Sequence, residues 1–385
     1  MTMLVCAILA AFVWLTLVFG RGGFWQVREA PKASGPMSHA RVVAVIPARN
    51  EASGIASTVE SLLRQDHPGD LSIVLVDDHS ADGTADLARA AAAAVGAVGR
   101  LEIVPARDLP AQWTGKLWAV SEGLRQAETR QPDYILLSDA DITHAPDNVS
   151  TLVRRAERDS LDLVSLMVRL STATWAEKAL IPAFVFFFFM LYPPRWAANP
   201  RSKMAAAAGG CMLVRPEVLD RIGGIAAIRG ALIDDCALAQ AIKSAGGRIR
   251  LDPSRHTVSS RVYGSAGEIW EMIARTAFTQ LHYSVALLLG TVLAMSLTFA
   301  APPLLTVFAR GPAQWLGALT WVAMGVAYYP TLRLYDRSPL WTLTLPLVAV
   351  FYSGATVGSA VNYWRGRGGQ WKGRAQAVRS RSSTA

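Results

Sequence analysis

The chain has 385 residues, of which 52% are hydrophobic, and it carries a formal net charge of +9. This hydrophobic content is high for a purely soluble protein, and the length allows one large domain together with a membrane portion. A basic excess can serve an anionic lipid or an anionic substrate. Binding to nucleic acid is disfavoured, because the sequence has neither an RNA-binding motif nor a basic stripe interleaved with aromatic residues. The three cysteines form no C-x-x-C pair, so we expect neither a disulfide framework nor a structural zinc site.

An apolar segment at residues 4–19 is followed by arginines, Arg21 and Arg28, and not preceded by them. A secretory signal peptide has the opposite order. Residues 1–20 are therefore predicted to form a transmembrane helix whose C-terminal end is cytoplasmic, as the positive-inside rule requires. Residues 21–40, rich in glycine and proline, are predicted to form a linker.

From residue 41 onward, short apolar runs alternate with helix-like segments. Strands are predicted at residues 41–46, 71–76, 101–104 and 134–137. Helices are predicted between them, at residues 53–65, 85–95 and 116–128. The alternation predicts a Rossmann-like, doubly wound α/β domain over residues 41–275, and the continuous apolar runs predict strands buried on both faces. In such a sheet, ligands bind beyond the carboxyl ends of the strands.

A further apolar stretch, residues 181–192, is about a dozen residues long and includes four consecutive phenylalanines. A bilayer-spanning helix needs roughly 20 residues, and basic residues flank this stretch. We therefore predict an interfacial helix near residues 178–195, lying in the plane of the membrane. A buried core helix is the alternative.

The C-terminal part is mostly apolar, and two or three spans are predicted, at residues 284–308, 315–334 and 340–362. The tail, residues 363–385, carries six basic residues and no acidic residue, which favours the cytoplasmic side. Three crossings after a cytoplasmic domain would place this tail outside. An even number of crossings would place it inside, and the sequence leaves open which segment fails to cross.

Two aspartates, Asp139 and Asp141, follow the fourth predicted strand. Side chains two residues apart on an extended chain point to the same side. Two carboxylates there can hold a hard cation such as Mg²⁺ or Mn²⁺, and substrate phosphates can complete its coordination shell. The alternative is a solvated turn with helix-capping acids, but the position after a buried strand favours the metal site.

Two other groups are predicted at the same edge of the sheet. Asp77 and Asp78 end the second predicted strand, and one of them is expected to face the cleft, where it could accept hydrogen bonds from a nucleobase or a ribose. Lys116 begins a predicted helix after the residues W-T-G, where its charge and the helix N-terminus could attract an anionic donor. The alternatives are a simple turn and a surface lysine.

A second acidic pair, Asp234 and Asp235, opens another predicted helix. A carboxylate that is ionised at neutral pH can accept the proton of an attacking hydroxyl. Helix capping explains one of the two aspartates but not a pair. Gly209 and Gly210, upstream of the pair, are candidates for the acceptor side of the pocket, with a plain turn as the alternative.

In this order the motifs resemble the inverting family 2 glycosyltransferases of the GT-A fold. The resemblance covers about residues 41–260 and rests on V-I-P-A-R-N-E at 45–51, V-D-D-H-S-A-D-G-T at 76–84, D-A-D at 139–141 and D-D at 234–235. Four shorter pieces and the C-terminal membrane block more narrowly resemble the hopene-associated glycosyltransferases of bacterial hopanoid clusters. These pieces are R-N-E at 49–51, W-T-G-K at 113–116, S-D-A-D-I at 138–142 and I-D-D-C at 233–236.

The resemblance implies a role for each matched residue. Contacts with the nucleotide sugar, commonly a UDP-sugar, would come from Pro47, Asn50, Glu51, Asp78, Lys116 and Asp139. Within that set, Asp78 would lie at the nucleobase and Asp139 near the ribose or the metal. Asp141 would bind the divalent cation, Asp235 would be the catalytic base, and Asp234 would support it.

The implied activity is sugar transfer from a nucleotide-sugar donor to a lipid acceptor, linked to hopanoid biosynthesis, at the cytoplasmic face of the bacterial inner membrane. Processive members of the family carry a Q-x-x-R-W motif. The corresponding residues here, 280–283, read Q-L-H-Y, which argues against a processive polysaccharide synthase and against an acceptor role for Gln280. The family-like W-K-G-R at 371–374 would bind phosphate or lipid headgroups.

Two alternatives remain open at this point. The D-x-D-x-T pattern at residues 139–143 also matches the nucleophile motif of haloacid dehalogenase-like phosphatases, although four α/β elements precede it here. A non-enzymatic membrane scaffold is the second alternative, and it gives no reason for polar clusters at strand ends.

Overall fold

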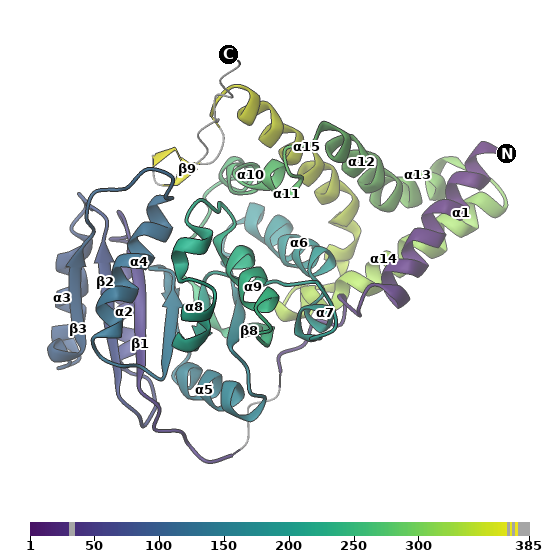
Figure 1. Cartoon of the computed structure of the whole chain (residues 1–385). Helices are drawn as coiled ribbons and strands as arrows, with labels where there is room; N and C mark the ends of the chain where they lie inside the picture. The colour runs from purple at the N-terminus through teal and green to yellow at the C-terminus, as the bar shows by residue number, and fades with distance from the viewer. Residues whose placement is uncertain (31–34, 368–369, 372–373, 376–385) are drawn as a thin grey trace.

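Figure 1 shows the protein as a computed structural model that describes residues 1–30, 35–367, 370–371 and 374–375. An α/β domain occupies one side, and a group of mostly apolar helices occupies the other. Lys372 and Gly373 of the W-K-G-R motif, and the tail beyond residue 375, lie outside the described residues.

The domain is built on one eight-stranded sheet with the strand order β3-β2-β1-β4-β7-β6-β8-β5. Its strands are β1 (Val42–Ala48), β2 (Leu71–Asp77), β3 (Leu101–Pro105), β4 (Tyr134–Ser138), β5 (Ile142–Thr143), β6 (Leu163–Arg169), β7 (Cys211–Val214) and β8 (Ile249–Ser259). The first four strands are parallel, whereas β7 runs antiparallel to both β4 and β6. The predicted parallel half of the sheet is therefore confirmed.

Helices cover both faces of the sheet, as a doubly wound fold requires. One face carries α2 (Ile55–Leu63), α3 (Thr84–Ala94) and α5 (Asn148–Arg158), which pack on the even-numbered apolar residues of β1. The other face carries α4 (Gly115–Glu128), α8 (Pro216–Arg221) and α9 (Asp234–Ser244), which pack on the odd-numbered ones. Residues of β1 are buried without exception, because both faces are covered.

Helix α4 lies unusually close to the sheet at Gly123. A Cβ atom at this position would lie 2.5 Å from Val45 Cγ1 and 2.9 Å from Val76 Cγ2. Because Gly123 has no side chain, α4 can pack directly on the sheet. This close packing helps to position the first turn of α4, which carries Lys116, relative to the strand ends.

The remaining elements form the apolar helical group and its connections. They are α1 (Thr2–Leu15), η1 (Thr16–Gly20), α6 (Trp175–Leu191), α7 (Pro194–Ala198), α10 (Ala266–Ala274), α11 (Ala277–Gln280), α12 (Val285–Met295), η4 (Ser296–Ala300), α13 (Ala301–Phe308), α14 (Pro312–Leu334), η5 (Pro339–Thr344) and α15 (Leu345–Trp364). Three short pieces complete the chain: η2 (Val98–Arg100), η3 (Ile225–Ile228) and the pair β9 (Gln370–Trp371) with β10 (Arg374–Ala375).

Within the described residues, three helical segments are long and apolar enough to cross a membrane: Thr2–Gly20, Val285–Phe308 and Pro339–Trp364. They coincide with the predicted N-terminal span and with the first and third predicted C-terminal spans. The second predicted span falls in α14, a 23-residue helix that is not among the three.

Helix α6 is partly buried, with the buried side chains mostly in its apolar run, and the predicted interfacial placement stays a prediction. Its aromatic rings pack on other helices: Phe186 contacts Tyr328 of α14, and Phe187 contacts Phe299 of η4 and Tyr352 of α15. The apolar run is therefore covered by protein on its long sides. The sequence pattern could not reveal this, because the partner helices lie more than a hundred residues downstream.

Candidate active site

The loops that follow β1 and β2 are tied together at the carboxyl edge of the sheet. The amide of Asn50 donates to Ser80 Oγ at 3.0 Å, and Asn50 Oδ1 accepts from the amide of Ala81 at 2.9 Å. The amide of Ala52 donates to Asp82 Oδ2 at 2.9 Å. These contacts fix the backbone around Asn50 and Glu51, the residues predicted to contact the nucleotide sugar.

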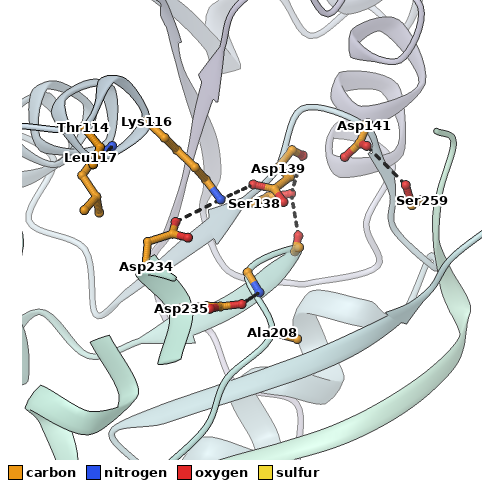
Figure 2. A network of polar contacts seen from close by, with 12 residues as sticks. Thr114, Lys116, Leu117, Ser138, Asp139, Asp141, Ala208, Asp234, Asp235 and Ser259 are labelled. Carbon is orange, nitrogen blue, oxygen red and sulfur yellow. Dashed lines mark hydrogen bonds and ion pairs between the residues drawn. The ribbon is translucent and has the colours of Figure 1, made fainter. Parts of the chain in front are cut away.

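Lys116 lies at the centre of the site (Figure 2). Its helix, α4, is capped by Thr114, whose side chain accepts from the amide of Leu117. Lys116 Nζ lies 2.8 Å from Asp139 Oδ1 and 3.0 Å from Asp234 Oδ2. The lysine thus joins an acid at the end of β4 to an acid at the start of α9, two elements that are distant in sequence.

The charge balance around Lys116 keeps it protonated. Burial acts to lower the pKa of Lys116, but the carboxylates of Asp139 and Asp234 outweigh burial, and the pKa is raised above its ordinary value. Its side chain is 21% exposed. Asp139 and Asp234 therefore both contact Lys116, which was predicted to contact the nucleotide-sugar donor.

Asp235 lies beside this bridge and is held by the backbone. Its Oδ2 accepts from the amide of Gly209 at 2.9 Å, and its Oδ1 accepts from its neighbour, Cys236, at 2.7 Å. Burial and, next, the charge of Asp234 raise the pKa of Asp235 to about 6, against the opposing effects of Lys116 and the two amides. The carboxyl is ionised near neutral pH but is more basic than an exposed aspartate, which suits a general base.

Asp141 lies on the far side of Asp139 from Asp234, and Ser259 Oγ donates to its Oδ2 at 3.3 Å (Figure 2). Burial raises the pKa of Asp141 to about 6, and repulsion by Asp139 and Glu51 adds to the increase. Neighbouring carboxylates of this kind suit a hard divalent cation. Among the described residues, no group of three or more His, Cys, Asp or Glu side chains could hold a metal.

The turn that carries Asp139 and Asp141 is supported by a histidine that the sequence analysis did not single out. His144 Nε2 lies 3.0 Å from Ser138 Oγ, and Asn148 Nδ2 lies 2.9 Å from His144 Nδ1. Since the amide nitrogen of Asn148 is a donor, His144 Nδ1 accepts and Nε2–H donates to Ser138. Burial lowers the pKa of His144 to about 3, so the ring is neutral and this polarity is maintained.

Asp78 is buried at the end of β2. It is 1% exposed, and Arg49 Nη1 lies 2.6 Å from its carbonyl oxygen and 3.6 Å from its Oδ2. Its predicted contact with the nucleobase stays a prediction. Pro47 lines a small cavity together with Lys116, Asp139 and Asp234.

The two glycines differ in their surroundings. A Cβ atom at Gly209 would lie 3.5 Å from both Asp235 Oδ2 and Lys116 Nζ, so Gly209 lies directly at the site. A Cβ atom at Gly210 would instead lie 3.1 Å from Val168 of β6, so this position points toward the sheet and not toward the site. The backbone of Gly210 still contributes, because its carbonyl accepts from the amide of Asp139 at 3.3 Å.

Residues 43–223 match a protein-family model described as glycosyl transferase family 2. These residues, slightly less than half of the chain, are therefore similar to a family 2 glycosyltransferase domain. The matched residues include β2 to β7 and all of β1 except Val42, and the order of strands agrees with the GT-A fold. The comparison favours the glycosyltransferase interpretation over the phosphatase alternative, because the acidic turn lies within the residues that match the glycosyltransferase model.

Two further comparisons agree with this family. The chain is 29% identical over 149 residues to 4,4'-diaponeurosporenoate glycosyltransferase from Staphylococcus aureus, which covers 38% of this chain. The chain spans 36% of the length of that relative. Its fold is similar to that of a mannosyltransferase from Pyrobaculum calidifontis solved with GDP-Man and Mn²⁺, with a TM-score of 0.57 and 20% identity over 94% of this chain and 99% of the other.

Proposed function

We propose that this glycosyltransferase is an inverting, membrane-bound enzyme that moves a sugar from a nucleotide-sugar donor to the hydroxyl of a membrane lipid. The observation that carries the proposal is the lysine-bridged acidic site, in which Lys116 contacts Asp139 on one side and Asp234, the neighbour of Asp235, on the other. The apolar helices next to the domain support a lipid acceptor, as does the similarity to an enzyme named for 4,4'-diaponeurosporenoate.

The donor is assigned to the side of β1, β2 and β4. Pro47, Asn50, Glu51 and Asp78 surround the strand ends where nucleotides bind in sheets of this kind, and a UDP-sugar is the proposed donor. Asp139 and Asp141 would hold Mg²⁺ or Mn²⁺, which would neutralise charge on the leaving diphosphate when bound. Lys116 adds a fixed positive charge at the same place.

Transfer is proposed to occur in one displacement. An acceptor hydroxyl gives its proton to a carboxylate oxygen of Asp235 while its oxygen forms a bond with the anomeric carbon. The bond from that carbon to the diphosphate breaks, and the phosphate oxygen keeps the electron pair. Asp234 holds Lys116 beside the reacting groups, and the amide of Gly209 fixes the orientation of Asp235. A single displacement inverts the anomeric centre.

The proposed location is the cytoplasmic membrane of a bacterium, with the catalytic domain in the cytoplasm. Within the family, the short motifs favour the hopene-associated subgroup, so the proposed acceptor is a triterpenoid or another hydroxyl-bearing lipid. Neighbouring genes for triterpene cyclisation would support this subgroup. An adjacent cluster for another class of lipid would contradict it.

The test is a transfer assay with the full-length protein in detergent. A panel of radiolabelled nucleotide sugars is incubated with Mn²⁺ and a bacterial lipid extract, and label in the organic phase is counted. One donor should give labelled lipid, and Asp235→Asn should abolish this product. Asp70→Asn removes an exposed carboxylate far from the site and should keep full activity. Equal labelling by the Asp235→Asn variant would contradict the proposal.

A further inference from the structure

The segment Pro339–Trp364, which consists of η5 and α15, is long and apolar enough to span a membrane. Its two ends pack on α6 and α11, helices that follow β6 and, through α10, β8 of the catalytic domain. At its start, the ring of Trp341 in η5 lies 5.9 Å from that of Trp175, the first residue of α6. At its end, Trp364 lies 5.7 Å from Phe278 of α11. In between, Tyr352 donates to the carbonyl of Leu180 in α6 at 3.0 Å. A helix that crosses a bilayer carries its two ends to opposite sides.

The middle of α15 also lies beside charged residues. Phe351, at the midpoint of the candidate segment, is 5.3 Å from Trp270 of α10. Trp270 fits over Gly354 and Gly358, where Cβ atoms would come within 2.9 and 3.0 Å of its ring. Glu268 and Glu271 of α10 are exposed. If α15 crossed the bilayer, these carboxylates would be carried to mid-membrane depth, which is strongly unfavourable.

The helices that precede α15 leave the catalytic domain and return to it. At the start of α12, Tyr283 stacks on Tyr363 of α15 at 4.4 Å. At the far end, Gln314 Nε2 donates to the carbonyl of Thr306, and Gly317 packs so closely that a Cβ atom would lie 3.1 Å from Pro302 O. After α14, Asp336 pairs with residues of β6 and β8, namely Arg169 at 2.9 Å and Arg255 at 3.0 Å.

Helix α1 runs beside this hairpin (Figure 1). Near its beginning, Ala7 packs with Leu305 and Ala313 at the far end of the hairpin. Beyond its end, Arg21 donates to the carbonyls of Met190 and Leu191 at the end of α6. In the part of the chain that the structure describes, the first turns of α1 and the α13–α14 loop form the end far from the catalytic domain, and the end of η1 and the α14–η5 connection lie near it.

We propose that α1, α12–α13 and α14 cross the bilayer, whereas α15 lies along the membrane surface between the bilayer and the catalytic domain. The surface that would face the lipid is the exposed apolar stripe of η5 and α15, which consists of Leu340, Leu343, Leu347, Val350 and Val357. The partner is the lipid surface itself, because the stripe continues into Trp364, Arg365 and Arg367, an aromatic and basic end suited to anionic headgroups. Two crossings after the domain place the basic tail on the domain's side.

This inference rests on the membrane association in the proposed function, and its test does not use transfer activity. Single cysteines are introduced at three exposed positions, Arg310→Cys at the far loop, Ser338→Cys before α15 and Arg367→Cys after it. Spheroplasts are treated with a membrane-impermeant maleimide before and after permeabilisation, and the unsubstituted chain gives the background from its own cysteines. Arg310→Cys should react in intact spheroplasts, and the other two should react only after permeabilisation.

Reaction of Ser338→Cys and Arg367→Cys from opposite sides would overturn the proposal, as would reaction of all three from one side. A second measurement uses a spin label at Val350→Cys in reconstituted vesicles. Surface placement predicts a shallow label close to the headgroups, and a label at the centre of the bilayer would contradict it. An inactive enzyme with the expected labelling would refute the proposed function and leave this topology intact.

Discussion

Replacing Lys116 by methionine should move the acidic limb of the activity profile toward higher pH. Asp235 must be ionised to accept a proton, and Lys116 helps to keep it so. Lys116 Nζ and Asp235 Oδ2 lie 3.5 Å from the same point, the Cβ position of Gly209, so they are at most about 7 Å apart. At this distance and an effective dielectric constant of about 20, a unit charge contributes about 2.4 kcal/mol. This corresponds to about 1.7 pH units.

The pKa of Asp235 should therefore rise from about 6 to between about 7 and 8 in the Lys116→Met variant, and kcat at pH 7 should fall roughly fivefold from this cause alone. The measurement is kcat against pH at saturating donor, which separates the effect on the base from weaker donor binding. Lys116→Arg keeps the charge and should keep the acidic limb in place. An unmoved limb in the methionine variant, with a measurable kcat, would refute the reasoning.

Three other substitutions have defined outcomes. Gly54→Ala would bring a Cβ atom within 3.0 Å of the Asp141 Cα, so the concentration of Mn²⁺ for half-maximal activity should rise severalfold. The control is Gly99→Ala, whose Cβ atom meets nothing within 4 Å and which should leave this concentration unchanged. Thr174→Ala removes the capping box of α6 and should lower the free energy of unfolding by about 1 kcal/mol, measured by thermal unfolding in detergent. The pKa of His144 is lowered to about 3 from an ordinary 6.5. The contribution of the neutral ring to the free energy of unfolding is therefore complete above pH 6.5 and is lost as the pH falls toward 3, by about 1.4 kcal/mol per pH unit. His144→Gln should flatten this dependence of stability on pH.

Each of these outcomes has a result that would contradict it. Equal Mn²⁺ dependence of the two glycine variants would remove any role for the close approach of α2 to Asp141. An unchanged unfolding temperature for Thr174→Ala would mean that tertiary packing alone holds the start of α6. A pH slope that is the same with and without the histidine would place the acid sensitivity elsewhere.

The first four strands and the three helices between them could be predicted from the sequence because their signals are local. Each strand is a mostly apolar run, and β2 and β4 lead directly into aspartates. The start of α4 was also predictable, since Thr114 caps it. Lys116 and the acidic pairs could be named as candidates for the same reason.

The partnerships between these residues could not be predicted, because they depend on tertiary structure. Nothing near Lys116 in the sequence indicates that it bridges Asp139 and Asp234. Strand β7 has only four residues and joins the middle of the sheet antiparallel to its neighbours, with no preceding hairpin signal. Ser259 reaches Asp141 only because β5 pairs with the last strand, β8. The burial of α6 likewise depends on distant helices.

The two acidic sites are assigned separate tasks, and one paired measurement tests this division most directly. Nucleotide binding and sugar transfer are measured side by side for Asp141→Asn and Asp235→Asn, with titration calorimetry of UDP in the presence of Mn²⁺ for the first quantity. Asp235→Asn should bind the nucleotide with unchanged affinity and transfer no sugar, whereas Asp141→Asn should lose the Mn²⁺-dependent part of the binding. Full transfer by the Asp235→Asn variant, or Mn²⁺-dependent binding that survives in Asp141→Asn, would contradict the account.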